Sequence, residues 1–189
     1  MNVLVAGHSF VRHLAFDVKV RGLKFQAPGV RVHLQGKGGA TICGPKPIDR
    51  EIAQTLRSAK FQIVILELGS NDLDTIRHPN WDTCKLAELY VKKAIDLVAA
   101  FGVKVVLCLP IPRDETQFPG SFERTSKFNQ VVVDLAKREH KVFTWAHKGL
   151  FKKDSRFLDR HGVHLNSKGS IRYFHSVKAA VKYHSSKFL

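Results

Sequence analysis

Residues 61–68 read Phe-Gln-Ile-Val-Ile-Leu-Glu-Leu, a run rich in branched side chains. A strand with one face in water alternates apolar and polar residues, but this run is continuous enough to be buried on both faces. Residues 103–109, Val-Lys-Val-Val-Leu-Cys-Leu, form a second buried run, which Pro110 and Pro112 bring to an end. Strands buried on both faces are typical of parallel sheets that helices cover from two sides.

Apolar runs and helical patterns alternate along the rest of the chain. In addition to the two runs above, strands are expected at residues 3–6, 30–34 and 141–144. Helices are expected from Ser9, over 47–59, from a cap at Asp82–Thr83 to Gly102, over 122–140, and from about Ser167. Strands that alternate with helices predict an α/β fold, an open and mostly parallel sheet with helices on both faces.

The balance of charges is far from neutral. The 189 residues include 31 Lys and Arg against 16 Asp and Glu, a formal net charge of +15. Such an excess favours polyanionic partners such as nucleic acid, or an anionic membrane surface, although a basic protein without such a partner is an equal alternative. Candidate contacts to RNA or single-stranded DNA cluster before and within the last helix: Lys148, Lys152, Lys153, Lys168 and Arg172. No recognition motif is evident, so such binding should tolerate any sequence and weaken as salt rises.

Length and cysteine content narrow the class of protein further. A chain of 189 residues suits one domain over residues 1–189, with roughly two-thirds of the unfolded surface buried on folding. Three cysteines without Cys-x-x-Cys spacing predict reduced thiols, and hence an intracellular protein of the cytoplasm or nucleus. The apolar start at residues 1–6 is too short for a secretory signal, and no run is long enough to cross a membrane. The sequence carries no signal for an oligomeric state.

Ligands of open α/β sheets bind beyond the carboxyl ends of the strands, so the residues just after each strand form the candidate site. Ser9 follows the first strand, where it could cap the next helix or act as a nucleophile at the positive end of that helix. The glycine-rich turn 36–41 could bring backbone N–H groups to a phosphate or an oxyanion, although it lacks the Gly-Lys-Ser/Thr ending of a P-loop. Asn71 could close a turn or donate its amide into a site.

Two histidines complete the set of candidate site residues. His161 and His164 lie three residues apart just before the last helix, a spacing open to a metal clamp, part of a catalytic centre, or a solvated loop. A zinc site needs a third and preferably a fourth ligand, and neither the cysteines nor the other histidines show ligand spacing. No metal or organic cofactor is therefore expected.

Four short blocks occur in the order and setting of the SGNH hydrolases, also called the GDSL family of esterases and lipases, which the chain resembles from end to end. Residues 7–10, Gly-His-Ser-Phe, resemble the nucleophile block of that family, and Gly-Gly at 38–39 resembles its glycine block. Gly-Ser-Asn-Asp at 69–72 and Gly-Val-His-Leu-Asn at 162–166 resemble its asparagine and histidine blocks. The first and last strings look closer to the esterase domains in the first open reading frame of animal retrotransposons than to secreted bacterial lipases.

The resemblance implies a flavodoxin-like three-layer α/β/α sandwich with five parallel strands in the order 2-1-3-4-5. It implies a carboxylic-ester hydrolase in which Ser9 is the nucleophile and His164 the general base, with the oxyanion held by the backbone N–H groups of Ser9 and Gly39 and by the amide of Asn71. The expected substrate is a small short-chain or acetyl ester, because no long apolar acyl channel is evident from the sequence. The alternative is a basic module on the same scaffold, with weak or no catalysis, that binds RNA or single-stranded DNA.

One position departs from the family pattern. The family usually has an aspartate three residues before the catalytic histidine, where this chain has His161. A histidine cannot supply the negative charge that orients and stabilises the imidazolium, so weak activity is expected. Asp159 could take that role, a backbone carbonyl could orient His164, or His161 could relay a hydrogen bond. His8, which stands where the family usually has an aspartate beside the nucleophile, should alter only local hydrogen bonding.

Overall fold

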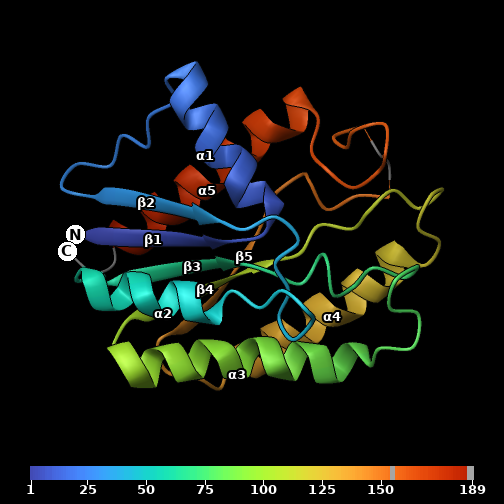
Figure 1. Cartoon of the computed structure of the whole chain (residues 1–189), viewed down its shortest axis with the longest axis horizontal. Helices are drawn as coiled ribbons and strands as arrows, with labels where there is room; N and C mark the ends of the chain where they lie inside the picture. The colour runs from blue at the N-terminus through green and yellow to red at the C-terminus, as the bar shows by residue number, and fades with distance from the viewer. Residues whose placement is uncertain (154–155, 187–189) are drawn as a thin grey trace.

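A computed structural model describes residues 1–153 and 156–186 of the chain. Its centre is a five-stranded sheet with the order β2-β1-β3-β4-β5, in which every neighbouring pair is parallel (Figure 1). The strands are β1 (Asn2–Gly7), β2 (Arg31–Gly36), β3 (Ile63–Glu67), β4 (Lys104–Leu109) and β5 (Val142–Ala146). The flavodoxin-like order 2-1-3-4-5 predicted from the resemblance is thereby confirmed.

A helix follows each strand, as the alternating sequence patterns predict. The helices are α1 (Ser9–Arg21), α2 (Asp49–Ser58), α3 (Thr83–Phe101), α4 (Ser121–Ala136) and α5 (Ser167–Ser186). Asp82 caps α3 by accepting the N–H groups of Cys84 and Lys85, and Gly102 ends it in the left-handed conformation, both as predicted. The prediction of a helix over 122–140 was too long. The backbone tightens after Ala136, because the N–H groups of Arg138 and Glu139 bond to carbonyls three residues back instead of four.

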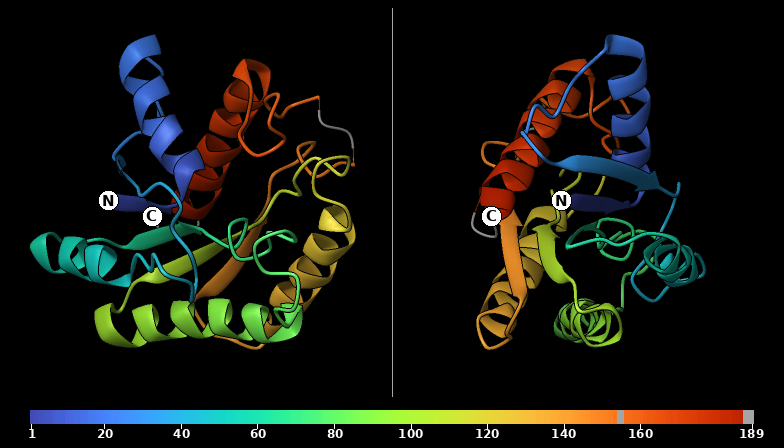
Figure 2. Two further views of the ribbon diagram at one scale, coloured as in Figure 1. Left: turned by 45° about the vertical axis from the view of Figure 1, so that its right-hand side comes forward. Right: turned by 90° about the vertical axis from the view of Figure 1, so that its left-hand side faces the viewer.

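Side chains alternate along the strands and build a separate core on each face of the sheet. Leu4 and Val64 pack in the core under α2, α3 and α4, whereas Val3 and Ile63 pack in the core under α1 and α5. Figure 2 shows the two groups of helices on opposite sides of the sheet. Because both faces are covered, apolar side chains are needed at nearly every strand position, which explains the continuous apolar runs.

The structure bears on two expectations from the sequence, the absence of a membrane-spanning segment and the reduced state of the cysteines. No helix in the described part of the chain is long and apolar enough to span a membrane. Cys43, Cys84 and Cys108 are all free thiols. Burial raises the pKa of Cys108 well above its ordinary value, so this thiol stays protonated inside the core.

Phe128 provides a test of the core between the sheet and α4. Its side chain is fully buried and lies against Tyr90, with ring centroids 5.9 Å apart. Phe128→Ala should lower the free energy of unfolding by about 3–5 kcal/mol, measured by urea denaturation, because it leaves a cavity the size of the ring. Phe16→Ala, at a ring on α1 that is 64% exposed, is the matched control and should change stability by less than about 0.5 kcal/mol. Equal losses in the two variants would contradict this packing.

Candidate active site

A glycine sets the turn between β1 and α1. A Cβ at Gly7 would lie 2.2 Å from the carbonyl oxygen of Glu67, so no larger residue fits against β3 here. His8 then caps α1, because its Nδ1 accepts the N–H of Phe10 at 3.3 Å. Ser9 is the first residue of the helix, so the capping role that the sequence left open for Ser9 falls to His8. The Ser9 hydroxyl is therefore not used as a cap and can bind another partner.

The partner of the Ser9 hydroxyl is His164, which lies in the loop before α5. The Oγ of Ser9 is 3.4 Å from the Nδ1 of His164. The pKa of this half-buried imidazole is below its ordinary value, because burial disfavours its charged form and because His13 lies beside it, with ring centroids 5.1 Å apart. At neutral pH the imidazole is therefore mainly uncharged and can accept a proton.

Asp159 shapes the loop that carries His164. Its Oδ1 accepts the backbone N–H groups of His161, Val163 and His164 at distances of 3.1, 3.3 and 3.3 Å. The negative charge of Asp159 raises the pKa of His164 and so opposes the effect of His13. Among the described residues, no carboxylate forms a hydrogen bond with the imidazole of His164. Asp159 therefore acts on His164 through the backbone and through space.

His161 lies at an exposed position of the same loop. Its Nε2 accepts the Nε–H of Arg160 at 3.2 Å. The two histidines consequently have different side-chain partners: Arg160 for His161, and Ser9 for His164.

The loop after β2 brings Gly39 to the same edge of the sheet. Gly39 has a φ of +73°, in the left-handed region that favours glycine. The buried carboxylate of Asp72, just after β3, anchors the loop by accepting the N–H groups of Ile42 and Cys43. Burial raises the pKa of Asp72, and these two donors partly offset that rise. The position of Gly39 is thus held from β3 as well as from β2.

Asn71 also follows β3, and both ends of its amide have partners. Its Nδ2 donates to the carbonyl of Ala40 at 2.9 Å, and its Oδ1 accepts an N–H of Arg113 at 3.2 Å. The second hydrogen on Nδ2 has no acceptor among the described residues, and the same holds for the backbone N–H groups of Ser9 and Gly39. Three N–H donors are therefore open just beyond the carboxyl ends of β1, β2 and β3.

The sequence reasoning missed two residues next to this group. Arg113 follows β4, is buried, and pairs with Asp74 in addition to Asn71. The rule that pointed to the residues after the first three strands applies equally to β4, and would have found Arg113. His13 lies four residues after Ser9, a spacing that places both side chains on one face of α1.

A buried polar cluster lies beneath the β1–α1 turn, and it too was not predicted. The fully buried carboxylate of Glu67 forms hydrogen bonds with His147 at 2.7 Å and with the hydroxyl of Tyr173 at 3.1 Å. Burial would raise the pKa of Glu67, but the charge and hydrogen bond of His147 outweigh it and the pKa is lowered. Burial lowers the pKa of the neighbouring His8 to about 4. Glu67, Cys108 and His147 offer potential metal ligands within 4.8 Å of one another, and the Nε2 of His147 is already bonded to the Oε2 of Glu67. The sequence signal that could have indicated this cluster was Glu67, an acidic residue inside the otherwise apolar strand β3.

Three of the five residues predicted to contact nucleic acid meet at one hollow. Lys148, Lys168 and Arg172 line a hollow of about 740 Å³ between the end of β5 and α5, together with Trp145 and Phe157. The guanidinium of Arg172 lies over the ring of Phe157, 5.2 Å from its centroid. Cations and aromatic rings are thus presented together on this part of the surface, which we call the β5–α5 hollow.

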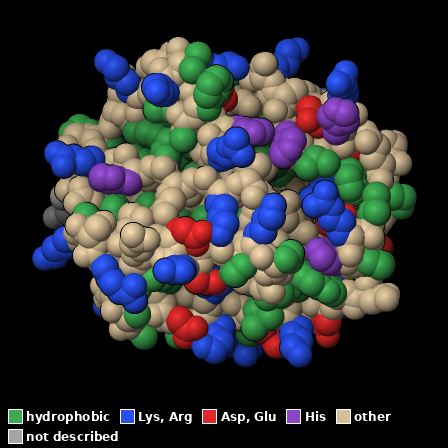
Figure 3. Space-filling view, viewed as in Figure 1, with side chains coloured by type: hydrophobic (Ala, Val, Ile, Leu, Met, Phe, Trp, Pro, Cys, Tyr) green, Lys and Arg blue, Asp and Glu red, His purple; other side chains and the backbone are tan. Residues whose placement is uncertain are grey.

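The other two predicted residues, Lys152 and Lys153, lie outside the β5–α5 hollow. Both are exposed, and the Nζ of Lys153 lies 5.3 Å from the centre of the Phe122 ring. Figure 3 shows that Lys and Arg side chains are spread widely over the face that it presents, with some of them beside histidines. The net charge of +15 is therefore not confined to one patch.

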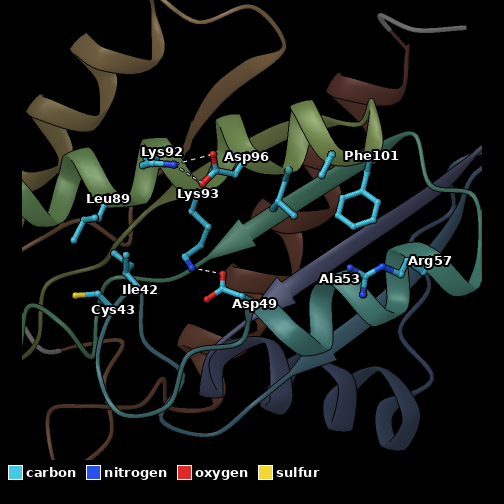
Figure 4. Close-up of a pocket in the computed structure, with 12 residues that line it drawn as sticks. Ile42, Cys43, Asp49, Ala53, Arg57, Leu89, Lys92, Lys93, Asp96 and Phe101 are labelled. Atoms are coloured by element: carbon cyan, nitrogen blue, oxygen red, sulfur yellow. Dashed lines mark hydrogen bonds and ion pairs between the residues drawn. The ribbon is translucent and has the colours of Figure 1, made fainter.

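A second hollow, of about 480 Å³ between α2 and α3, is lined by two ion pairs and by Arg57, whose guanidinium lies 5.9 Å from the centre of the Phe101 ring (Figure 4). Lys93 pairs with Asp49, and Lys92 pairs with Asp96 at 2.8 Å. Ser9 is not among the residues that line it. The two ion pairs cancel, and Arg57 leaves one excess positive charge in the lining of this hollow.

Comparison with known proteins agrees with the fold. Residues 7–170 match the GDSL-like Lipase/Acylhydrolase family. An acetyl esterase mutant with acetate ion has a TM-score of 0.71 at 17% identity, with 100% of both chains covered. An acetyl xylan esterase has a TM-score of 0.70 at 19% identity, with 96% of this chain and 100% of that chain covered. The lipase/acylhydrolase from Enterococcus faecalis has a TM-score of 0.68 at 20% identity, with 97% of each chain covered. At such identities the structural likeness establishes the fold alone, and no curated protein matches this chain.

Substitutions of His13 and of Asp159 should shift the pKa of His164 in opposite directions. His13→Gln removes a positive charge and should raise this pKa. Asp159→Asn keeps an oxygen for the backbone N–H groups but removes the negative charge, so it should lower this pKa. An NMR titration of the imidazole C–H signals measures both shifts, with the exposed His140→Gln as a control that should cause none. A lowered pKa in His13→Gln would show that the two rings do not interact as described.

Proposed function

The chain belongs to the GDSL-like lipase/acylhydrolase family, and from this premise we propose that it hydrolyses short-chain or acetyl esters through Ser9 and His164. The observation that carries the proposal is the 3.4 Å distance between the Oγ of Ser9 and the Nδ1 of His164. The low pKa of His164 supports it, because a general base must be uncharged before it accepts a proton.

The reaction proceeds through an acyl-enzyme. His164 takes the hydroxyl proton of Ser9 as the Oγ attacks the carbonyl carbon of the ester, and a tetrahedral oxyanion forms. The bond to the alcohol oxygen then breaks, and the imidazolium returns the proton to that oxygen. In the second half, water gives a proton to His164 and attacks the acyl group, and the Ser9 hydroxyl is restored as the acid leaves. The sequence of steps needs no cofactor.

Three donors would stabilise the oxyanion. They are the backbone N–H groups of Ser9 and Gly39 and the second N–H of the Asn71 amide, none of which has a partner among the described residues. Each donor of this kind is worth roughly 3 kcal/mol of the barrier, about a hundredfold in rate. The positive end of α1, where Ser9 lies, acts in the same direction.

Asp159 would provide the negative charge near His164, although it does not bond the imidazole. Its contacts are the three backbone N–H groups of the loop, and its charge favours the imidazolium that forms during the reaction. His161 supplies no negative charge. In serine proteases a correct third residue is worth about 10⁴ in turnover, so this arrangement should give a slow enzyme.

The choice of a short acyl group rests on proteins that share the fold. Two proteins with the same fold are an acetyl esterase and an acetyl xylan esterase, which makes an acetyl ester the first substrate to test.

A small fluorophosphonate tests the proposal without knowledge of the substrate, because it phosphonylates only an activated serine. Wild type should gain the mass of one adduct in intact-mass spectrometry. Ser9→Ala and His164→Ala should gain none, since the first lacks the nucleophile and the second lacks the base.

Ser70→Ala is the matched control for this experiment. Ser70 also follows a strand and is as buried as Ser9, at 9% exposed, but it should play no part in the reaction. This variant should label like wild type. No adduct on a folded wild type, under conditions that label a known serine esterase, would refute the proposed hydrolysis.

The β5–α5 hollow favours a second function, the binding of RNA or single-stranded DNA. Lys148, Lys168 and Arg172 could contact phosphates there while a base stacks on Trp145, and no carboxylate is among the residues that line the hollow. Stacking on aromatic rings with cations alongside is how single strands bind without regard to sequence. This function is independent of Ser9 and can accompany hydrolysis.

Two variants of equal net charge test the hollow. Lys168→Gln/Arg172→Gln changes it, whereas Lys85→Gln/Lys127→Gln removes two charges from exposed positions on α3 and α4. Fluorescence anisotropy with a 20-nucleotide single strand should show a loss of about tenfold in affinity for the first pair only, and a salt slope lower by about 1 per residue removed. Equal losses in both pairs would mean that net charge alone binds the strand, and would refute a site at the hollow.

A further inference from the structure

We infer that Arg113 is a positioning residue for ester hydrolysis: its guanidinium holds the Asn71 amide in the one orientation that presents an N–H to the oxyanion. The inference rests on the proposed function, and it concerns a residue that contacts neither Ser9 nor His164 by a hydrogen bond. It follows from the hydrogen bonds of a single amide group.

The Asn71 amide has an acceptor oxygen and a donor NH₂, and the partner of each could not form a hydrogen bond with the other. Arg113 can only donate, and it donates from Nη2 to Oδ1 at 3.2 Å. The carbonyl of Ala40 can only accept, and it accepts from Nδ2 at 2.9 Å. A rotation of the amide by 180° would place NH₂ against the guanidinium and oxygen against the carbonyl, so both bonds would be lost. The amide is therefore fixed, and the N–H bond to the second hydrogen of Nδ2 points in a single direction.

Arg113 is itself held rigidly. Its Nη1 pairs with the buried carboxylate of Asp74, whose other oxygen accepts the N–H groups of Ile76 and Arg77 at 3.0 Å each. Its guanidinium lies over the ring of Phe118, 4.8 Å from the centroid. The side chain of Arg113 is only 8% exposed, and that of Asp74 only 2%. The donor that fixes the amide is thus preorganised, as oxyanion stabilisation requires.

The charge of Arg113 reaches His164 in addition to the hydrogen bond that Arg113 makes with Asn71. Burial and His13 are the main causes of the low pKa of His164, and the positive charge of Arg113 adds to them. Arg113 thus helps to keep the base uncharged, while its guanidinium bonds the carbonyl oxygen of the amide that would donate to the oxyanion. Asp74 compensates the charge, which is why a guanidinium can remain buried at this position.

A double-mutant cycle with Asn71 tests whether Arg113 acts through the amide. Arg113→Met should lower kcat on an acetyl ester between about tenfold and a hundredfold in wild type, with little change in KM, because the donor matters only in the transition state. In an Asn71→Ala background the same substitution should cost less than about threefold, since the amide is already gone. Arg113→Lys should recover only part of the loss, because an ammonium cannot bond Asp74 and Asn71 as a fork does.

Arg124→Met is the matched control. Arg124 is a partly buried arginine that donates to the carbonyl of Trp81 and does not bond Asn71, so kcat should stay within about twofold of wild type. Circular dichroism and thermal melting report whether each variant folds, and Arg113→Lys replaces Arg113→Met in the cycle if the latter does not. An equal loss from the Arg113 substitution with and without Asn71, or no loss in either, would overturn the inference.

The NMR signals of the Asn71 side-chain NH₂ give a readout that does not depend on activity. In wild type the two protons should give sharp signals at shifts away from those of a freely rotating asparagine, and in Arg113→Met both should broaden and move towards those shifts as the side chain begins to rotate about Cβ–Cγ. Arg124→Met should leave them unchanged. If wild type turns over no ester while the signals behave in this way, the proposed hydrolysis fails but the hold of Arg113 on Asn71 stands. Signals that are the same in Arg113→Met and wild type would overturn the inference whatever the activity.

Discussion

The close approach of Gly7 to β3 is the constraint on which the arrangement of the site depends. A Cβ at Gly7 would lie 2.2 Å from the carbonyl oxygen of Glu67, and the N–H of His8 bonds that same oxygen at 3.1 Å. At Gly36, a Cβ would lie 2.1 Å from the backbone nitrogen of Arg12, so α1 packs directly against the end of β2. Between these two contacts α1 begins, and Ser9 is placed at its first turn with no freedom to shift along the sheet.

Buried polar groups near the site bond one another, and each of these contacts joins different parts of the chain. Glu67 in β3 bonds His147 after β5, and Asp74 after β3 pairs with Arg113 after β4. Asp72 accepts backbone N–H groups from the loop after β2. Burying a charge is costly unless it is paired, so these contacts are hard to rearrange. They hold the loops in place, which leaves Asp159 as the carboxylate whose charge raises the pKa of His164.

The sequence predicted those residues of the candidate site that come directly after a strand. Ser9 and Asn71 each come just after an apolar run, and parallel strands bring such positions to one edge of a sheet. The same reasoning, extended to the fourth strand, would have included Arg113. The partner of Asp159 was not predictable, because a carboxylate two residues from His161 could equally have met an imidazole or the backbone. The helix cap was also open in the sequence, since His8 and Ser9 can both accept the N–H of a first turn.

The sequence by itself determined the fold and the identity of the groups at the carboxyl edge of the sheet. Continuous apolar runs need two covered faces, and alternation with helices then leaves a parallel sheet as the arrangement that satisfies them. The pairing of those groups was decided only by tertiary structure. Ser9 and His164 are 155 residues apart in the chain, and Asn71 and Arg113 are 42 apart. A hydrogen bond forms or fails within a few tenths of an ångström, and distances on that scale depend on how the loops close over the sheet rather than on the local pattern of residues.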